Sequence, residues 1–93
     1  MKNDKDAEVI MNELFNILVT KHADYGPLNI AHAPGGAMNG LLVRMHDKMA
    51  RLKNLIYNNA TPNYESIEDT LIDLANYAII GLLVQRGQWE GLE

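Results

Sequence analysis

The sequence predicts an all-α fold, in which a three-helix subunit assembles with further copies into an oligomeric helical bundle. Apolar residues recur at helical spacing in three long segments. Glycine and proline separate these segments, and no segment shows the strict alternation of a half-buried strand. The 93 residues, of which 47% are hydrophobic and 22% charged, suit one small folded domain over residues 1–93.

The first helix is expected from about residue 4 to residue 22. Its apolar residues keep helical spacing, and Asn3 or Asp4 is placed to cap its start. Residues 23–36 contain three glycines and two prolines, so they are expected to form a loop without regular structure. Long ordered loops in small domains are often functional, which makes this segment a candidate part of a site.

The second helix is expected over residues 37–58 and the third over residues 65–86. Pro62 lies in the break between them. Ser66 and Asp69 have the spacing of a capping-box variant at the start of the third helix. The second helix carries one apolar stripe, which consists of Met38, Leu41, Leu42, Met45, Met49, Leu52 and Ile56.

Apolar residues cover too much of the third helix for one pair of helices to bury. This surplus predicts self-association into a dimer or higher oligomer that completes a helical bundle. The alternative is that the third helix is simply the central element of a monomer. The residues concerned are Leu71, Ile72, Leu74, Ala75, Ala78, Ile79, Ile80, Leu82, Leu83 and Val84.

The composition argues against several classes of protein. A net charge of −4 makes direct DNA binding unexpected as the main role. The absence of cysteine excludes disulfides and thiolate metal sites. The N-terminal residues do not resemble a signal peptide, and Asp73 and Asn76 interrupt the apolar run that precedes the C-terminus. We therefore expect a cytoplasmic protein without a membrane span.

A polar stripe runs along the otherwise apolar third helix. At about 100° per residue, Glu65, Asp69, Asp73 and Asn76 fall within an arc of about 80°. Carboxylates four residues apart on a helix can share a divalent cation, and oxygen ligands are those that Mg²⁺ prefers. Asp69 and Asp73 are therefore candidate magnesium ligands.

The second helix carries a row of basic residues whose charge is opposite to that of this stripe. Arg44, Lys48 and Arg51 fall within about 60° of one another, and such a row can balance the charge of a phosphate. The alternative is that the basic and acidic rows form salt bridges with each other. In the loop, Tyr25 can stack on a base and Asp24 can join a metal shell, although most turns of this kind are only turns.

Three segments resemble a known family: "KHADYG", "LLVRMHDKMARLKNLI" and "ESIEDTLIDLANYAIIGLL". In this order, from about Lys21 to Leu83, they resemble the phage and bacterial family called nucleotide modification associated domain 1. The resemblance implies an association with phage nucleotide metabolism and DNA base modification. It places the protein in the cytoplasm of the host if the chain is phage-encoded.

A more distant similarity is to the MazG-like all-α nucleoside triphosphate pyrophosphohydrolases. It implies a dimeric or tetrameric helical bundle that holds Mg²⁺ with acidic residues from two helices. Asp69 and Asp73 would be the catalytic metal ligands of the later helix, at i,i+4 where that family has i,i+3. Glu13 would contribute from the first helix, which lacks the ExxE pattern of that family.

Three functions follow as alternatives. In a Mg²⁺-dependent pyrophosphohydrolase, metal-activated water attacks phosphorus and releases pyrophosphate. A non-catalytic protein would instead sequester cyclic nucleotide signals of host defence, which needs cationic pockets but no metal. A helical accessory protein would use its charged rows only to pair with each other. The residues expected to bind nucleotide are Arg44, Lys48, Arg51, Asp24, Tyr25 and Asn76.

Overall fold

The computed structural model describes residues 1–58 and 61–92, and this part of the chain contains four helices and no strand. The helices are α1 (Asp4–Tyr25), α2 (Leu28–Ala31), α3 (Ala37–Tyr57) and α4 (Ile67–Gln85). The predicted all-α class is confirmed, with three substantial helices and one short helical turn. None of the helices in the described ranges is long and apolar enough to cross a membrane.

Residues 23–36 are more regular than a loop. α1 continues to Tyr25 and ends where Gly26 adopts a φ of 69°, while the Gly26 N–H still donates to the His22 carbonyl. Pro27 follows as the N-cap of α2, with a φ of −87° close to that of a helix. The prediction of an irregular loop was therefore wrong for Leu28–Ala31, because glycine and proline here end one helix and begin another.

The helix starts differ in how they are capped. Asn3 is the N-cap of α1, but its side chain makes no capping hydrogen bond. α4 begins at Ile67, and the capping box predicted from Ser66 and Asp69 is confirmed. The Asp69 N–H donates to Ser66 Oγ at 3.0 Å, and the Ser66 N–H donates to Asp69 Oδ2 at 3.2 Å.

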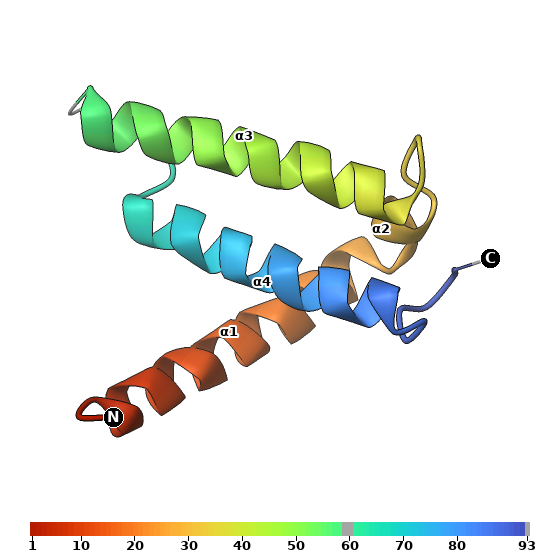
Figure 1. Cartoon of the computed structure of the whole chain (residues 1–93), viewed down its shortest axis with the longest axis horizontal. Coiled ribbons are helices and arrows are strands. Elements are labelled where there is room, and N and C mark those ends of the chain that lie inside the picture. The colour runs from red at the N-terminus through yellow and green to blue at the C-terminus, as the bar shows by residue number, and fades with distance from the viewer. Residues whose placement is uncertain (59–60, 93) are drawn as a thin grey trace.

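α4 is the central element of the chain. It packs along α3 on one side and crosses α1 on the other, as Figure 1 shows. One buried cluster joins Ile30 of α2 to Ala37 and Leu41 of α3 and to Ile80 of α4. α4 thus has two neighbouring helices within one chain. This agrees with the alternative in which the third predicted helix is the central element of the subunit.

The first helix contacts α4 through polar side chains near its middle and end, and its Leu18 packs against the apolar cluster. None of its residues is buried. Asn76 Nδ2 of α4 donates to the Leu14 carbonyl at 3.2 Å, and Lys21 Nζ lies 2.8 Å from Asp73 Oδ1. These contacts bring the C-terminal half of α1 against α4, at the place where the charged side chains gather.

Candidate functional site

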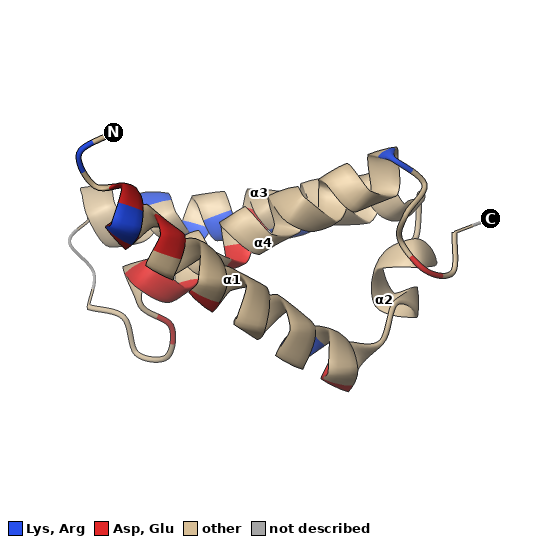
Figure 2. Cartoon of the chain, turned by 90° about the horizontal axis from the view of Figure 1, so that it is seen from below, with Lys and Arg blue, Asp and Glu red and all other residues tan. Residues whose placement is uncertain are grey.

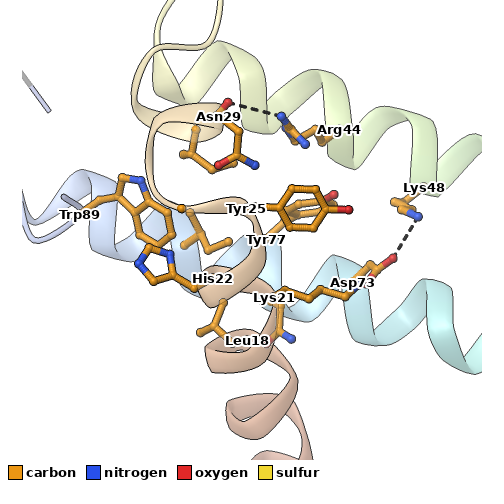
Figure 3. Close-up of a pocket in the computed structure, with 14 residues that line it drawn as sticks. Leu18, Lys21, His22, Tyr25, Asn29, Arg44, Lys48, Asp73, Tyr77 and Trp89 are labelled. Carbon is orange, nitrogen blue, oxygen red and sulfur yellow. Dashed lines mark hydrogen bonds and ion pairs between the residues drawn. The ribbon is translucent and has the colours of Figure 1, made fainter. Parts of the chain in front are cut away.

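A pocket lies between α1, α3 and α4, with α2 and the C-terminal segment at one end. Its cavity volume is about 290 Å³, at the lower limit of typical ligand pockets. Figure 3 shows side chains from all of these elements around it. Its aromatic walls are His22, Tyr25, Tyr77 and Trp89, and its charged walls are Lys21, Arg44, Lys48 and Asp73.

Arg44 differs from the two lysines of this pocket because it contacts a carbonyl group and they contact carboxylates. Its Nη2 donates to the Asn29 carbonyl of α2 at 3.3 Å. Within residues 1–58 and 61–92, no carboxylate lies within 4.0 Å of its guanidinium. An arginine fork that contacts only a neutral carbonyl keeps donors for an anionic ligand.

The other two cations of the basic row are paired. Lys48 Nζ lies 2.8 Å from Glu65 Oε1 and 2.9 Å from Asp73 Oδ2. Arg51 donates through Nη2 to the Glu65 carbonyl, and its Nε lies 3.8 Å from Glu65 Oε2. The predicted alternative, in which the basic and acidic rows pair, therefore holds for Lys48 and Arg51.

Asp73 sits between two lysines that come from different helices. Its side chain is only 15% exposed, and it contacts Lys21 of α1 and Lys48 of α3. Burial raises the pKa of Asp73, but the hydrogen bonds and the positive charges of Lys21 and Lys48 together outweigh this and leave the pKa below its usual value. The pKa of Lys48 is lowered by burial but raised more strongly by hydrogen bonds to Glu65 and Asp73.

The depressed pKa of Asp73 predicts a loss of stability in acid. The carboxylate stabilises the fold above its unfolded pKa of 3.8, and this contribution is lost as the pH falls through the lower folded pKa. Thermal unfolding of the native protein and of Asp73→Asn across pH measures it. The native protein should have the higher Tm at about pH 6, and the difference should shrink below about pH 4. A difference that stays constant into acid would contradict the pairing.

Asp69 has a local structural role. Its side chain accepts hydrogen bonds from the Ser66 hydroxyl at 2.9 Å and from the Ser66 backbone N–H, and these bonds lower its pKa. It lines a shallow second pocket with Glu65 and Asp73, away from Arg44. Figure 2 shows acidic segments of α1 and α4 at this same end of the molecule.

The capping box predicts a clear effect of removing Ser66. Ser66→Ala should cost about 1 kcal/mol, which corresponds to a fall in Tm of about 4–8 °C for a domain of this size. Asp69→Ala should lower Tm in the same direction in buffer with EDTA, because it removes the other half of the box. Differential scanning calorimetry measures both, with Ser66→Thr as the control that keeps a capping hydroxyl. If Asp69 were only a metal ligand, its removal would leave Tm in EDTA unchanged.

The residues predicted to hold Mg²⁺ are not gathered into a metal site. Over the described ranges, no three histidine or acidic side chains lie where they could bind one ion. Glu13 and Asp24 are exposed on α1, and neither lines the pocket. Asp69 is engaged by Ser66, and Asp73 by two lysines. These side chains do not fit Mg²⁺ as they are arranged within one chain.

Four of the six residues predicted to bind nucleotide line the pocket: Tyr25, Arg44, Lys48 and Asn76. Arg51 lies outside it, held by Glu65. The site predicted from the sequence did not include Lys21, His22, Asn29, Tyr77 or Trp89. Lys21 and His22 belong to the segment "KHADYG". Trp89 is distant from them in sequence and comes close only in the folded chain. Its Nε1 donates to the Pro27 carbonyl at 3.0 Å, and its ring contacts the His22 ring edge to face.

The pocket walls also contain unused hydrogen-bonding capacity. Asn76 is 6% exposed, and after its Nδ2 has donated to Leu14 its buried Oδ1 has no partner among the described residues. Asn29 Oδ1 and His22 Nδ1 are in the same condition. A buried polar atom without a partner costs about 1–3 kcal/mol. These three residues line the cavity, but the three atoms themselves are buried, so a ligand could contact them only after the surrounding side chains shift.

The fold and this pocket define the chain as a small all-α protein with a cationic, aromatic-walled cavity. The chain belongs to the nucleotide modification associated domain 1 family, whose model matches residues 21–84, more than half of its length. The match confirms the predicted resemblance and begins at Lys21 of the pocket. No curated protein and no solved structure matches the chain.

Proposed function

We propose that the protein binds a nucleotide in this pocket, with a phosphate on Arg44. The observation that carries the proposal is the guanidinium of Arg44, which faces the cavity and has no carboxylate partner among the described residues. Lys21 and Lys48 lie in the same walls, so three cations there face the single carboxylate of Asp73. Membership of a family associated with nucleotide modification is consistent with this chemistry.

The rest of the pocket suits a nucleobase. Tyr25 and Tyr77 line the cavity together with the His22–Trp89 pair. Stacking of a base on an aromatic ring is worth about 1–3 kcal/mol and tolerates different bases. The amide side chains of Asn29 and Asn76 also line the cavity, and amides can pair with the donors and acceptors of a nucleobase. A cavity of about 290 Å³ is at the lower limit of typical ligand pockets, which favours a small ligand over a polymer.

The geometry favours binding without hydrolysis over the pyrophosphohydrolase alternative. Two lysines neutralise Asp73, and Asp69 completes the cap of α4. Both carboxylates would have to exchange these partners before they could act as metal ligands. A metal-independent binder of a nucleotide or cyclic nucleotide requires no such exchange, because Arg44 and the lysines already face the cavity.

A thermal-shift screen tests the proposal. Mononucleotides, di- and triphosphates and cyclic nucleotides are compared, each with Mg²⁺ and with EDTA. A ligand that binds only the folded state at 100 times its Kd stabilises it by about 2.7 kcal/mol, so we expect a Tm rise of about 10–20 °C in EDTA. Stabilisation only with Mg²⁺, together with release of pyrophosphate, would support the hydrolase. No shift with any nucleotide would leave the accessory-protein alternative.

A further inference from the structure

An apolar stripe runs along the outer face of α3, where four of its six residues are exposed and the other two, Met45 and Leu52, are half-buried. Its residues are spaced alternately by four and three positions, which is the heptad pattern of a coiled-coil seam. The stripe consists of Met38, Leu42, Met45, Met49, Leu52 and Ile56. Four of them are strongly exposed: Met38 by 43%, Leu42 by 66%, Met49 by 44% and Ile56 by 50%.

α3 therefore has two apolar faces with different neighbours. Leu41 and Leu55 are buried, 1% and 6% exposed, on the side that packs within the chain. The stripe of Met38 to Ile56 lies away from that side. Figure 1 shows α3 at the outer edge of the molecule, with α4 on its inner side. A seam with heptad spacing fits another helix that carries a similar stripe.

The chain exposes more surface than a compact monomer of its size. Its accessible surface is 6878 Å², whereas a folded monomer of 10.4 kDa is expected to expose about 5,400 Å². Its radius of gyration is 14.6 Å, against about 12.3 Å expected for 93 residues. The excess of about 1,500 Å² is of the size that one subunit buries in an obligate interface.

We infer that the heptad stripe of α3 is a dimerisation surface and that a second copy of this chain covers it. The occupant is a second copy because both chains carry the same stripe, so two α3 helices can meet in a self-complementary interface about a two-fold axis. Each α3 brings its packed α4, and the two pairs form a four-helix core. The pockets lie between α1, α3 and α4 of each chain, and the stripe of α3 is not part of their walls.

Sedimentation equilibrium of the native protein and two matched variants tests this inference. Leu42→Glu places a charge in the stripe, whereas Val43→Glu places the same charge on the neighbouring residue, which is 53% exposed but outside the stripe. At micromolar concentration we expect the native protein and Val43→Glu at twice the mass of one 10.4 kDa chain, and Leu42→Glu at the mass of one chain. Circular dichroism of Leu42→Glu shows whether its monomer keeps its helices.

Cross-linking provides a second measurement that does not depend on a disruptive substitution. The chain has no cysteine, so Met49→Cys introduces a single thiol near the middle of the stripe. A short bis-maleimide should join two such chains, and it should not join two chains of Val43→Cys. A monomeric native protein would overturn the inference. So would a dimer that persists in Leu42→Glu. If that dimer were lost in Phe15→Glu, the interface would lie on α1.

Discussion

Replacing Arg44 by alanine is expected to weaken nucleotide binding by about 10- to 100-fold. A hydrogen bond between charged groups contributes about 1.5–3 kcal/mol, and each 1.4 kcal/mol is a factor of ten in Kd. The effect should be this large because Lys48 and Arg51 already serve Glu65, so neither replaces the missing fork. Isothermal titration calorimetry in EDTA, with the nucleotide that stabilises the native protein most, measures the change.

Two control variants isolate the contribution of the Arg44 fork. Lys53→Ala removes an exposed cation from the same helix without touching the pocket, so its Kd should match that of the native protein. Arg44→Lys keeps the charge but loses the planar pair of donors, so its Kd should lie between that of the native protein and that of Arg44→Ala. Equal affinity of Arg44→Ala and the native protein would place the phosphate elsewhere. The Tm of Arg44→Ala should first be compared with that of the native protein, because Arg44 also donates to the Asn29 carbonyl and its loss can affect the fold.

Replacing Asp73 by asparagine should strengthen metal-free nucleotide binding by about tenfold. The native carboxylate holds Lys21 at 2.8 Å and Lys48 at 2.9 Å, so a phosphate must compete with it for both cations. Asparagine has nearly the same shape without the charge, so it frees Lys21 for the ligand, while Lys48 keeps its second carboxylate partner, Glu65. A gain of one charge-assisted hydrogen bond, about 1.5 kcal/mol, corresponds to this factor. Calorimetry in EDTA measures it.

This substitution also separates binding from hydrolysis. A pyrophosphohydrolase that uses Asp73 to hold Mg²⁺ would lose turnover in Asp73→Asn, whereas a binder would return its ligand intact from both proteins. Glu65→Gln is the matched control, because Glu65 pairs with Lys48 but does not line the pocket. Its effect on Kd should be smaller. Weaker binding of Asp73→Asn in EDTA would show that the carboxylate contacts the ligand itself.

The sequence predicted the helices because their signals are local. The periodicity of α1, α3 and α4 and the capping box of Ser66 and Asp69 depend only on neighbours within a few positions. Glycine and proline were also local signals, but they were interpreted as a loop where they border the short helix α2. The position of α4 between α1 and α3 was left open, since periodicity does not say how many neighbours a helix has.

The site was predictable in chemistry but not in pairing. Arg44 and Arg51 occupy the same row of α3, and no local pattern tells them apart. The difference between them arises because the chain before α4 brings Glu65 to Arg51, while Arg44 lies beside α2. Lys21 and Asp73 are 52 positions apart, so their contact exists only once α1 has packed on α4.

The apolar stripe of α3 illustrates the same limit. Leu41 and Leu42 are consecutive residues and belong to one stripe in the sequence, yet Leu41 is 1% exposed and Leu42 is 66% exposed. The inner residue packs within the chain, and the outer one belongs to the heptad seam. Only the position of α4 separates the two faces. The sequence predicted self-association from α4, whereas in the folded chain the exposed heptad seam is on α3.

The most direct test of the central proposal, that a nucleotide enters the pocket between α1, α3 and α4, is a fluorescence titration of Trp89. This is the only tryptophan of the chain, and it forms part of the pocket wall beside His22. The proposal predicts a saturable change in its emission in EDTA, with the midpoint found by calorimetry and a weaker midpoint in Arg44→Ala. A nucleotide that stabilises the protein without changing Trp89 emission, or the absence of binding by any nucleotide, would contradict it.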